Sequence, residues 1–217
     1  GLTVGLSVYK FGSLLVTYEE SHDTFYVNHE RIFTAGSVFS EAGASNVGIG
    51  ETDGIYTALA PFIESSVPEM EAVARTVRQE FLLSIDDNHY YQGIRFADPA
   101  FLGIFDFEYI EGNESALDDP TGLLLTASTA KKLFGEGVVK GRVLTLDHDV
   151  ALHVTAVIKD LPPNTHFNSS IIQPGIFEIL APLRALNRAT DYDLAGNFNN
   201  ITMGDMTYML APADKPL

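Results

Sequence analysis

His148 and His153 stand beside two carboxylates, Asp147 and Asp149, in a stretch that is otherwise apolar. Imidazole nitrogens and carboxylate oxygens are ligands that zinc accepts in proteins, so the chemistry open to this group is metal binding. The two histidines are five positions apart, and residues an odd number apart face opposite sides of a continuous strand. We therefore predict a polar turn between two strands and no metal ion.

Two further segments have part of a ligand-binding pattern. Gly48–Gly54 is rich in glycine, but its third glycine comes one position late for a dinucleotide-binding turn and no firm strand precedes it. Asp191–Gly196 begins like a calcium loop, yet Ala195 stands at the fifth ligand position and Thr202 stands where a bidentate glutamate is needed. We expect a flexible or lid-like loop in the first case and a polar turn in the second.

Catalytic signatures are missing from the sequence. It contains no G-x-S-x-G, no H-E-x-x-H and no phosphate-binding P-loop, and it has no cysteine for thiolate chemistry, disulfides or cysteine metal sites. We predict no catalytic residue, no metal and no cofactor. A hydrolase of unfamiliar type stays open as an alternative, and it requires a strongly perturbed carboxylate or histidine cluster in a cleft.

Length and charge limit the size of the domain and the kinds of partner that it can bind. The chain has 217 residues, 46% of them hydrophobic, which is enough to bury the core of one large domain or two small ones. Its 29 acidic and 13 basic residues give a formal charge of −16. Nucleic acids and anionic lipid surfaces attract clustered Lys and Arg, so we expect neither as a partner. The acidic side chains are expected to form a solvated surface.

The middle of the chain reads as a compact strand and helix unit. Leu123–Leu125 is typical of a short buried strand, and the residues up to Phe134 are typical of a helix. Thr126 or Ser128 can cap the start of that helix, and Gly135 ends it.

Two more strands follow this helix. Gly141 opens a strand that contains Val143 and Leu146, and the apolar run Val150–Ile158 follows across a polar turn, which predicts a hairpin. The pair Pro162-Pro163 ends the second strand because proline lacks the amide donor that a strand ladder needs.

The rest of the chain mixes strands and helices. We predict strands over residues 32–41, 67–85, 90–96 and 206–210, and helices over residues 56–63, 98–105 and 174–186, the last interrupted by Pro182. This order favours an α+β fold with mainly antiparallel hairpins.

The first 18 residues or so are apolar apart from Lys10 and a few Ser and Thr. As a helix they would be roughly 27 Å long, which is marginal for crossing a bilayer, and a lysine at mid-span adds to the cost. They also lack the basic start and cleavage site of a signal peptide. A buried strand or helix of a soluble protein is one interpretation of this segment.

A set of motifs from the same central region supplies a second interpretation. The run ASTAKKLFG, followed by KGRVLTL and VTAVIKDLPPNTHF, resembles the extracytoplasmic core domain of MacB-like and FtsX-like permeases of ABC transporters. Tyr18–Phe33 (YEESHDTFYVNHERIF) and Phe96–Asn113 (FADPAFLGIFDFEYIEGN) fit the same family in the same order. Ala156 stands where the family usually has Gly, and Thr165 where it commonly has Ser. Both substitutions are small and affect local turn geometry.

The resemblance implies an architecture. It divides the chain into the end of a first transmembrane helix with its stalk at residues 1–22, a porter-like βαβ lobe at residues 23–100 and 175–217, and an inserted mixed α/β second lobe at residues 101–174. The family motif marks structural residues, namely Phe134, Gly135, Gly141, Asp160, Leu161, Pro162, Asn164 and His166. The coupling stalk is marked by Leu15, Tyr18 and Asp23.

The same motif suggests a local role for its polar end. Asn164, Thr165 and His166 are expected to hydrogen-bond backbone that the two prolines leave unpaired. We interpret His166 as part of the architecture and not as a catalytic group.

The resemblance also implies a function. It predicts a periplasmic, non-catalytic domain of an inner-membrane permease that passes ATP-driven movement to the export or release of an antibiotic, a lipoprotein or a peptide. The implied partners are a separate cytoplasmic ATPase, a second permease copy, and a periplasmic adaptor or lipoprotein.

A soluble extracytoplasmic ligand-binding module is the main alternative. In that case a hydrophobic pocket would be lined by aromatic side chains, namely Tyr90, Tyr91, Phe96, Phe101, Phe105, Phe107 and Tyr109. Aromatic residues at such spacing more often form a core.

Overall fold

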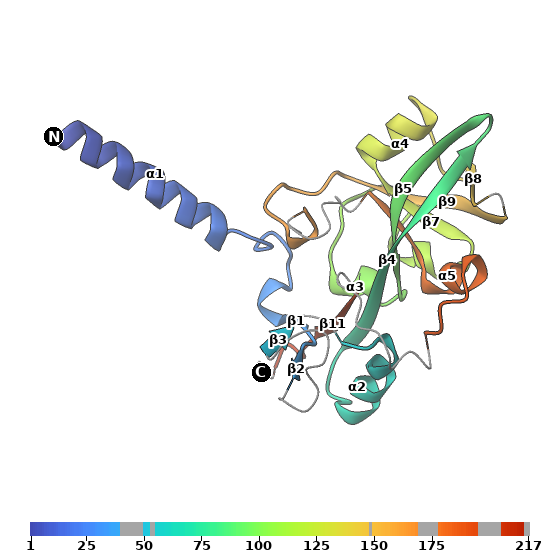
Figure 1. The fold of residues 1–217 in the computed structure, drawn as a ribbon, viewed down its shortest axis with the longest axis horizontal. Helices are drawn as coiled ribbons and strands as arrows, with labels where there is room; N and C mark the ends of the chain where they lie inside the picture. Colours follow the sequence, from blue (N-terminus) through green and yellow to red (C-terminus); the bar gives the residue numbers. More distant parts are fainter. Residues whose placement is uncertain (40–49, 53–54, 148, 169–177, 195–204, 215–217) are drawn as a thin grey trace.

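A long N-terminal helix and a strongly curved β-sheet make up the computed structural model of this chain (Figure 1). The structure describes residues 1–39, 50–52, 55–147, 149–168, 178–194 and 205–214. Its α-helices are α1 (Leu2–Glu20), α2 (Ala60–Ser66), α3 (Phe101–Ile104), α4 (Ala127–Phe134) and α5 (Leu183–Ala189). Short 3-10 helices are η1 (His29–Arg31), η2 (Thr57–Leu59), η3 (Glu114–Leu117) and η4 (His166–Asn168).

The strands fall into two sheets. They are β1 (Ile32–Thr34), β2 (Ser37–Phe39), β3 (Gly50–Thr52), β4 (Ala72–Ile85), β5 (Asn88–Ala97), β6 (Tyr109–Glu111), β7 (Gly122–Thr126), β8 (Val143–Leu146), β9 (Val150–Ile158), β10 (Ile179–Pro182) and β11 (Met206–Leu210). Strands β2 and β3 pair only with each other in the described chain, and the others form one sheet in the order β1-β11-β4-β5-β10-β7-β9-β6. Strand β8 pairs with both β4 and β9.

The large sheet closes on itself. Because β8 joins β9 to the far end of β4, the path β4-β5-β10-β7-β9-β8 returns to its start. Most strand pairs are antiparallel, while β10 with β5 and β7 with β9 are parallel. The β7–α4–β8–β9 segment and the neighbouring parallel pairs give the α+β class that the sequence predicts.

Two hydrophobic clusters occupy the two faces of this sheet, because side chains alternate along a strand. On β7, Leu123 and Leu125 belong to the first cluster and Leu124 to the second. The first cluster fills the inside of the closed path and is covered by α4 and α5. The second cluster, on the outer face, contains α3 and a group of aromatic rings.

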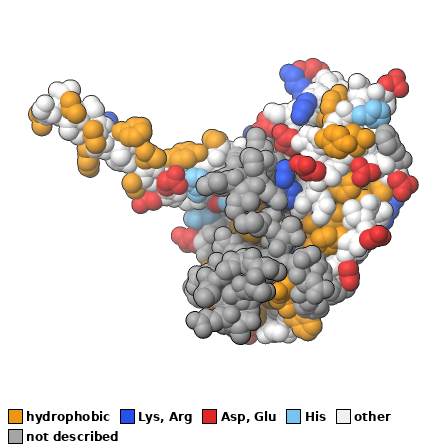
Figure 2. Space-filling view, in the orientation of Figure 1, with side chains coloured by type: hydrophobic (Ala, Val, Ile, Leu, Met, Phe, Trp, Pro, Cys, Tyr) orange, Lys and Arg blue, Asp and Glu red, His pale blue; other side chains and the backbone are white. Residues whose placement is uncertain are grey.

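Helix α1 stands apart from both clusters. It projects away from the sheet (Figure 1), and none of its residues is buried. Figure 2 shows apolar side chains along its surface. Leu6, Phe11 and Leu14 of this helix are each more than 60% exposed. Within the described ranges, no helix combines the length and the apolarity that crossing a bilayer needs.

The local predictions for the central unit are confirmed. Strand β7, helix α4 and the β8–β9 hairpin lie where the pattern places them. Neither Thr126 nor Ser128 caps α4 with its own side chain, however. The cap comes from Asp160, whose carboxylate accepts hydrogen bonds from the Ser128 amide at 2.9 Å and the Ser128 hydroxyl at 2.5 Å.

Three element predictions need correction. Residues 179–182 form strand β10 between β5 and β7 instead of helix, and α5 starts at Leu183. The region 32–41 holds two short strands that pair with different partners. The helix expected over 56–63 begins at Ala60 with Pro61 in its first turn, a position where proline's missing amide costs nothing.

The large sheet contains strands from both predicted lobes. Strands β1, β11, β4, β5 and β10 come from residues 23–100 and 175–217, and β6 to β9 come from residues 101–174. The division into two lobes stays a prediction.

Candidate functional site

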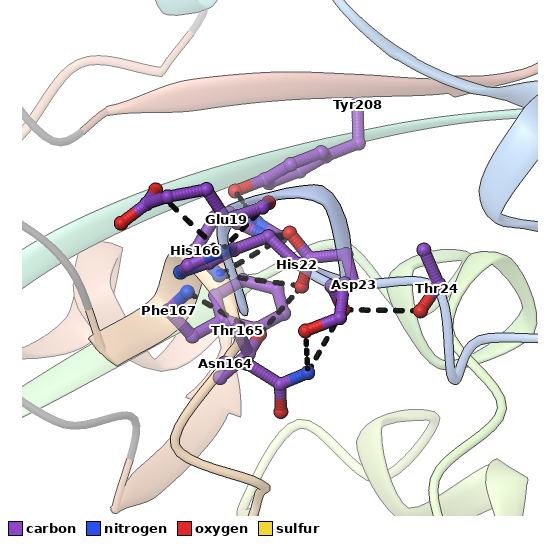
Figure 3. A network of polar contacts seen from close by, with 10 residues as sticks. Glu19, His22, Asp23, Thr24, Asn164, Thr165, His166, Phe167 and Tyr208 are labelled. Atoms are coloured by element: carbon purple, nitrogen blue, oxygen red, sulfur yellow. Dashed lines mark hydrogen bonds and ion pairs between the residues drawn. The ribbon is translucent and has the colours of Figure 1, made fainter. Parts of the chain in front are cut away.

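The end of helix α1 is shaped by hydrogen bonds that turn the chain toward the domain. Ser21 follows the helix, and its hydroxyl donates to the Tyr18 carbonyl oxygen at 2.7 Å. The Thr24 hydroxyl donates to the Ser21 carbonyl at 3.0 Å. Asp23 between them has a φ of 57°, the left-handed region that Asp and Asn tolerate better than most residues. This turn points the Asp23 carboxylate at the chain after Pro163 (Figure 3).

The Asp23 carboxylate is bound by the polar end of the family motif. The Thr165 hydroxyl donates to it at 2.7 Å, and the His166 amide lies 3.2 Å from both oxygens. His166 Nδ1 lies 2.8 Å from Oδ2. A carboxylate beside a ring nitrogen accepts a hydrogen bond from it, so Nδ1 carries a proton. Figure 3 shows these groups converging on the carboxylate.

Asn164 holds the same turn through its side chain and its backbone. Its side-chain amide donates to the Ser21 carbonyl at 2.8 Å and to the Ser21 hydroxyl at 3.0 Å. In the other direction, the Asp23 amide donates to the Asn164 carbonyl at 3.0 Å. The backbone that Asn164 satisfies therefore belongs to the end of the stalk helix, 143 positions away in the sequence.

His166 extends this contact to the C-terminal strand. Its Nε2 lies 2.9 Å from the hydroxyl of Tyr208, a residue of β11 that is 2% exposed. With the proton on Nδ1, a neutral ring accepts the Tyr208 hydrogen at Nε2. This group of residues links the end of α1, the start of η4 with the loop before it, and strand β11. We call it the stalk junction, and it comprises Ser21, Asp23, Asn164, Thr165, His166 and Tyr208.

The pKa shifts fit these hydrogen bonds. Burial raises the pKa of Asp23, but hydrogen bonds from His166 and from the Thr165 hydroxyl outweigh it and hold the pKa below its ordinary value of 3.8. Burial raises the pKa of Tyr208 to about 12. At neutral pH the carboxylate is thus charged and the phenol is neutral, which is the pairing that the distances require.

An aromatic cluster packs against the stalk junction. Phe105 lies at its centre, with ring centroids 5.0 Å from Tyr26, 5.1 Å from Phe167 and 5.1 Å from Tyr208. Tyr26 follows the Asp23 turn directly and is 2% exposed. Edge-to-face rings at these distances pack well, so the turn after α1 is anchored by apolar contacts as well as by hydrogen bonds.

The remaining motif residues shape the unit that carries this loop. Gly135 ends α4 with a φ of 78°, and Gly141 turns into β8 with a φ of 86°, both in the region where glycine has no steric penalty. The Phe134 ring lies 5.2 Å from the Arg142 guanidinium. Leu161 packs against the second cluster.

The predicted stalk residues differ in their surroundings. Leu15 and Tyr18 lie on the exposed surface of α1, with 46% and 44% of their surface accessible. The Tyr18 ring meets the His22 ring edge to face at 5.3 Å. Asp23, by contrast, is tied into the domain.

The other candidate groups do not form a binding site in the parts of the chain that the structure describes. His153 Nε2 pairs with Asp119 at 3.5 Å, while His148 lies outside the described residues. Most of Gly48–Gly54 and the end of Asp191–Gly196 also lie outside them. No group of three or more His, Asp or Glu side chains with metal-binding geometry occurs among the described residues.

Most aromatic residues of the ligand-binding alternative lie in the two hydrophobic clusters and do not line one pocket. Phe96 belongs to the first cluster, whereas Phe101, Phe105 and Phe107 belong to the second, on the opposite face of the sheet. Tyr91 is 83% exposed. A surface pocket of about 230 Å³ lies elsewhere, between α2 and the ends of β4 and β5.

The sequence does not reveal two members of the stalk junction. Ser21 reads as an ordinary turn residue, and Tyr208 reads as one apolar residue in a closing strand. Only the fold brings them together with Asp23 and His166. The feature that marks Tyr208 is its hydroxyl, because a tyrosine in a buried strand needs a hydrogen-bond partner for that group.

The chain is similar in sequence and fold to several known proteins. The family of MacB-like periplasmic core domains matches residues 3–214. A domain of a protein assigned as a permease from Porphyromonas gingivalis is 26% identical with a TM-score of 0.66, and the match covers 89% of this chain and 78% of that one. No curated protein matches the chain.

Two other solved structures share the fold at lower identity. The periplasmic region of MacB from Actinobacillus actinomycetemcomitans is 11% identical with a TM-score of 0.57, over 84% of this chain and 76% of that one. The extracellular domain of the noncanonic ABC-type transporter YknZ from Gram-positive bacteria is 12% identical with a TM-score of 0.55, over 84% and 83%. The family match over nearly the whole chain, together with this fold, shows that the chain belongs to the MacB-like periplasmic core domains of ABC transporter permeases.

Proposed function

We propose that this domain is a non-catalytic coupling element, which moves as one body with its stalk helix when ATP is used by a separate cytoplasmic ATPase. The observation that supports the proposal is the stalk junction. It binds the end of α1 to the loop before η4 by side-chain and backbone hydrogen bonds, and through His166 to Tyr208 in β11.

The junction is suited to transmitting force because it has little freedom. A helix is a stiff lever only while its hydrogen-bonded turns are continuous, and α1 has no proline between Leu2 and Glu20. At its end the chain does not pass into a free linker. Instead, Asp23 and Tyr26 fix the next turn by charge-assisted bonds and by burial.

The second membrane connection in this proposal is the chain after β11. Strand β11 pairs with β1, and Ala211 exchanges hydrogen bonds with Arg31, whose guanidinium donates to the Ala211 carbonyl at 2.7 Å. Arg31 also pairs with Glu71 at 3.0 Å. The incoming and outgoing segments are therefore held together, so that movement of either one displaces the other.

This proposal implies a set of partners. The permease would act as a dimer with the ATPase on the cytoplasmic side, and its periplasmic domains would act on an adaptor, a lipoprotein or an exported substrate. The excess of acidic residues favours a basic surface on whichever outer partner binds.

A proline that interrupts helix α1 tests the proposal. In the full-length permease with its ATPase in lipid nanodiscs, a spin label at Val138→Cys, a position 79% exposed, reports movement of the domain. We expect Leu15→Pro to leave ATP hydrolysis intact and to abolish the ATP-dependent change of the label's signal, because proline interrupts α1. The matched control, Leu15→Ala, should retain both. An undiminished response in the proline variant would overturn the proposal.

A further inference from the structure

Four exposed cations of this domain lie within twelve positions of the sequence. Lys131 and Lys132 belong to α4, and Lys140 and Arg142 belong to the loop between α4 and β8. The whole chain has only 13 basic residues and a formal charge of −16. Figure 2 shows Lys and Arg side chains together where Figure 1 places α4, far from the N-terminus of α1. We call residues 131–142 the basic segment.

The basic segment has few carboxylates to neutralise it. Glu136, its one acidic residue, pairs with Lys131 at 2.6 Å. Glu111 of β6 lies beside the loop, and its carboxylate accepts hydrogen bonds from the Lys140 amide at 2.8 Å and the Val139 amide at 3.3 Å. The described residues supply no ion pair to the other three cations of the segment. A surplus of positive charge therefore faces the solvent.

The loop that carries the last two cations has a fixed shape. The Arg142 amide donates to the Val139 carbonyl at 2.9 Å, and the Gly141 amide donates to the Val154 carbonyl of β9 at 2.7 Å. The Arg142 guanidinium lies over the Phe134 ring, 5.2 Å from its centre, which restrains the cation. A surface that is already ordered loses little conformational entropy when a partner binds.

Val138 gives the same loop an exposed apolar side chain. It is 79% exposed, whereas its neighbour Val139 is 4% exposed and belongs to the first cluster. The loop therefore has one valine that attaches it to the core and one that is open to the solvent. Binding surfaces on proteins commonly combine an apolar centre with a polar rim, and arginine is among the residues enriched in them. Val138, with Lys140 and Arg142 in the same loop, has that composition.

We propose that the basic segment is a docking surface for an outer protein partner, which it binds through carboxylates next to an apolar side chain. The carboxylates meet the cations, and the apolar side chain of the partner lies against Val138. This inference rests on the proposed coupling function and names the chemistry of the surface that the partner presents to the domain.

Charge complementarity is the reason for choosing acidic groups. The rest of the domain is acidic, so it attracts a basic partner and repels carboxylates. The basic segment has the opposite preference, and at physiological salt exposed charges more than about 8 Å away are largely screened, so a partner responds to this local charge. Carboxylates on an otherwise basic partner would therefore fit the domain in one orientation only. An inorganic anion would meet the cations but would leave Val138 in water, which favours a protein as the occupant.

A titration followed by nuclear magnetic resonance tests the docking surface. The 217-residue chain is labelled with nitrogen-15, and the peptide acetyl-Glu-Asp-Leu-Asp-Glu-amide is added at about 0.15 M salt. We expect the amide resonances of residues 131–142 to shift in a saturable manner, with the largest changes at Val138 and Lys140. The matched peptide acetyl-Gln-Asn-Leu-Asn-Gln-amide, which has the same shape without the charge, should leave them in place.

Three single substitutions locate the binding. Lys140→Gln and Arg142→Gln each remove one cation and should raise the dissociation constant about two- to fivefold, as expected for one exposed charge pair. Val138→Ser removes the apolar contact and should weaken binding to a similar degree. The control is Lys159→Gln, because Lys159 is also exposed but lies outside the segment, where it pairs with Glu108. It should leave the dissociation constant unchanged.

Binding that depends on the carboxylates, on the cations and on Val138 together supports the docking surface. Absent shifts, shifts of the same size with the uncharged peptide, or equal weakening by Lys159→Gln would overturn it. Binding that Val138→Ser leaves unchanged would also refute it, because non-specific attraction of anions then explains the result. The titration needs neither ATPase nor membrane, so a failed docking surface and a failed coupling function give separate results.

Discussion

Replacing Asp23 separates the contribution of its charge from that of its backbone conformation. Asn tolerates the φ of 57° as Asp does and keeps one acceptor oxygen, so Asp23→Asn removes only the ionised acceptor of His166 Nδ1. A hydrogen bond to a charged group contributes about 1.5 to 3 kcal/mol. The Asp23 side chain is 26% exposed, which favours the lower end. We expect a loss of about 1.5 kcal/mol in the free energy of unfolding.

Asp23→Ala should cost more. It removes the acceptor of Thr165, whose side chain is fully buried, and it places a side chain without a local hydrogen bond in the left-handed region. The expected loss is about 3 to 4 kcal/mol. Asp23→Gly removes the same bonds without the backbone penalty and should fall between the other two.

Urea unfolding followed by circular dichroism gives these differences directly. The control is Asp119→Asn, which neutralises a carboxylate that also accepts from a threonine and faces a histidine, but at the exposed surface, and should cost less than about 1 kcal/mol. If Asp23→Asn costs no more than Asp119→Asn, the charge at the stalk junction does not stabilise it, and our reasoning is wrong.

Three other substitutions or conditions test the structure around the junction. The pKa of Asp23 is lowered in the folded chain, so the ionised carboxylate stabilises the fold above the ordinary value of 3.8, and this stabilisation is lost as the pH falls below it. The difference in unfolding free energy between the native chain and Asp23→Asn should therefore vanish in acid. Asp160→Ala removes the carboxylate that caps α4 at Ser128 and should cost about 1 kcal/mol in thermal or urea unfolding, with Lys159→Ala as a neutral reference. Gly112→Ala should cost about 2 to 4 kcal/mol in urea unfolding, because φ is 76° and the new Cβ would lie 2.3 Å from the Thr155 carbonyl oxygen; a stable Gly112→Ala variant would contradict the described turn.

Local patterns account for the parts of the fold that the sequence predicts. The unit from β7 to β9 is specified by short-range signals: an apolar strand, a helix ended by Gly135, a polar turn and two prolines. Residues 179–182 show the limit of such signals. Their apolar spacing suits a helix, but a place between β5 and β7 lets four buried side chains complete the sheet, and this tertiary pairing overrides the local pattern.

Only some residues of the stalk junction could be predicted from the sequence, and their contacts could not. Asp23 and His166 each stand out in the sequence, one at the end of the stalk and the other in the family motif. Their contact is not visible there, because 143 residues separate them and no local periodicity connects them. Tyr208 is hidden for a different reason: its role comes from its hydroxyl, while its strand is defined by apolar packing.

The central claim is that the domain and its stalk move as one body, and a distance measurement tests it most directly. These 217 residues contain no cysteine. In a permease whose remaining cysteines are replaced, Val16→Cys on α1 and Val138→Cys on the domain give one pair of spin labels in each copy for pulsed electron paramagnetic resonance. We predict a single narrow distance distribution that ATP does not alter in the full-length permease, and a broader one after Asp23→Ala. A distribution that is already broad in the native protein, or that stays equally narrow after Asp23→Ala, would contradict the account.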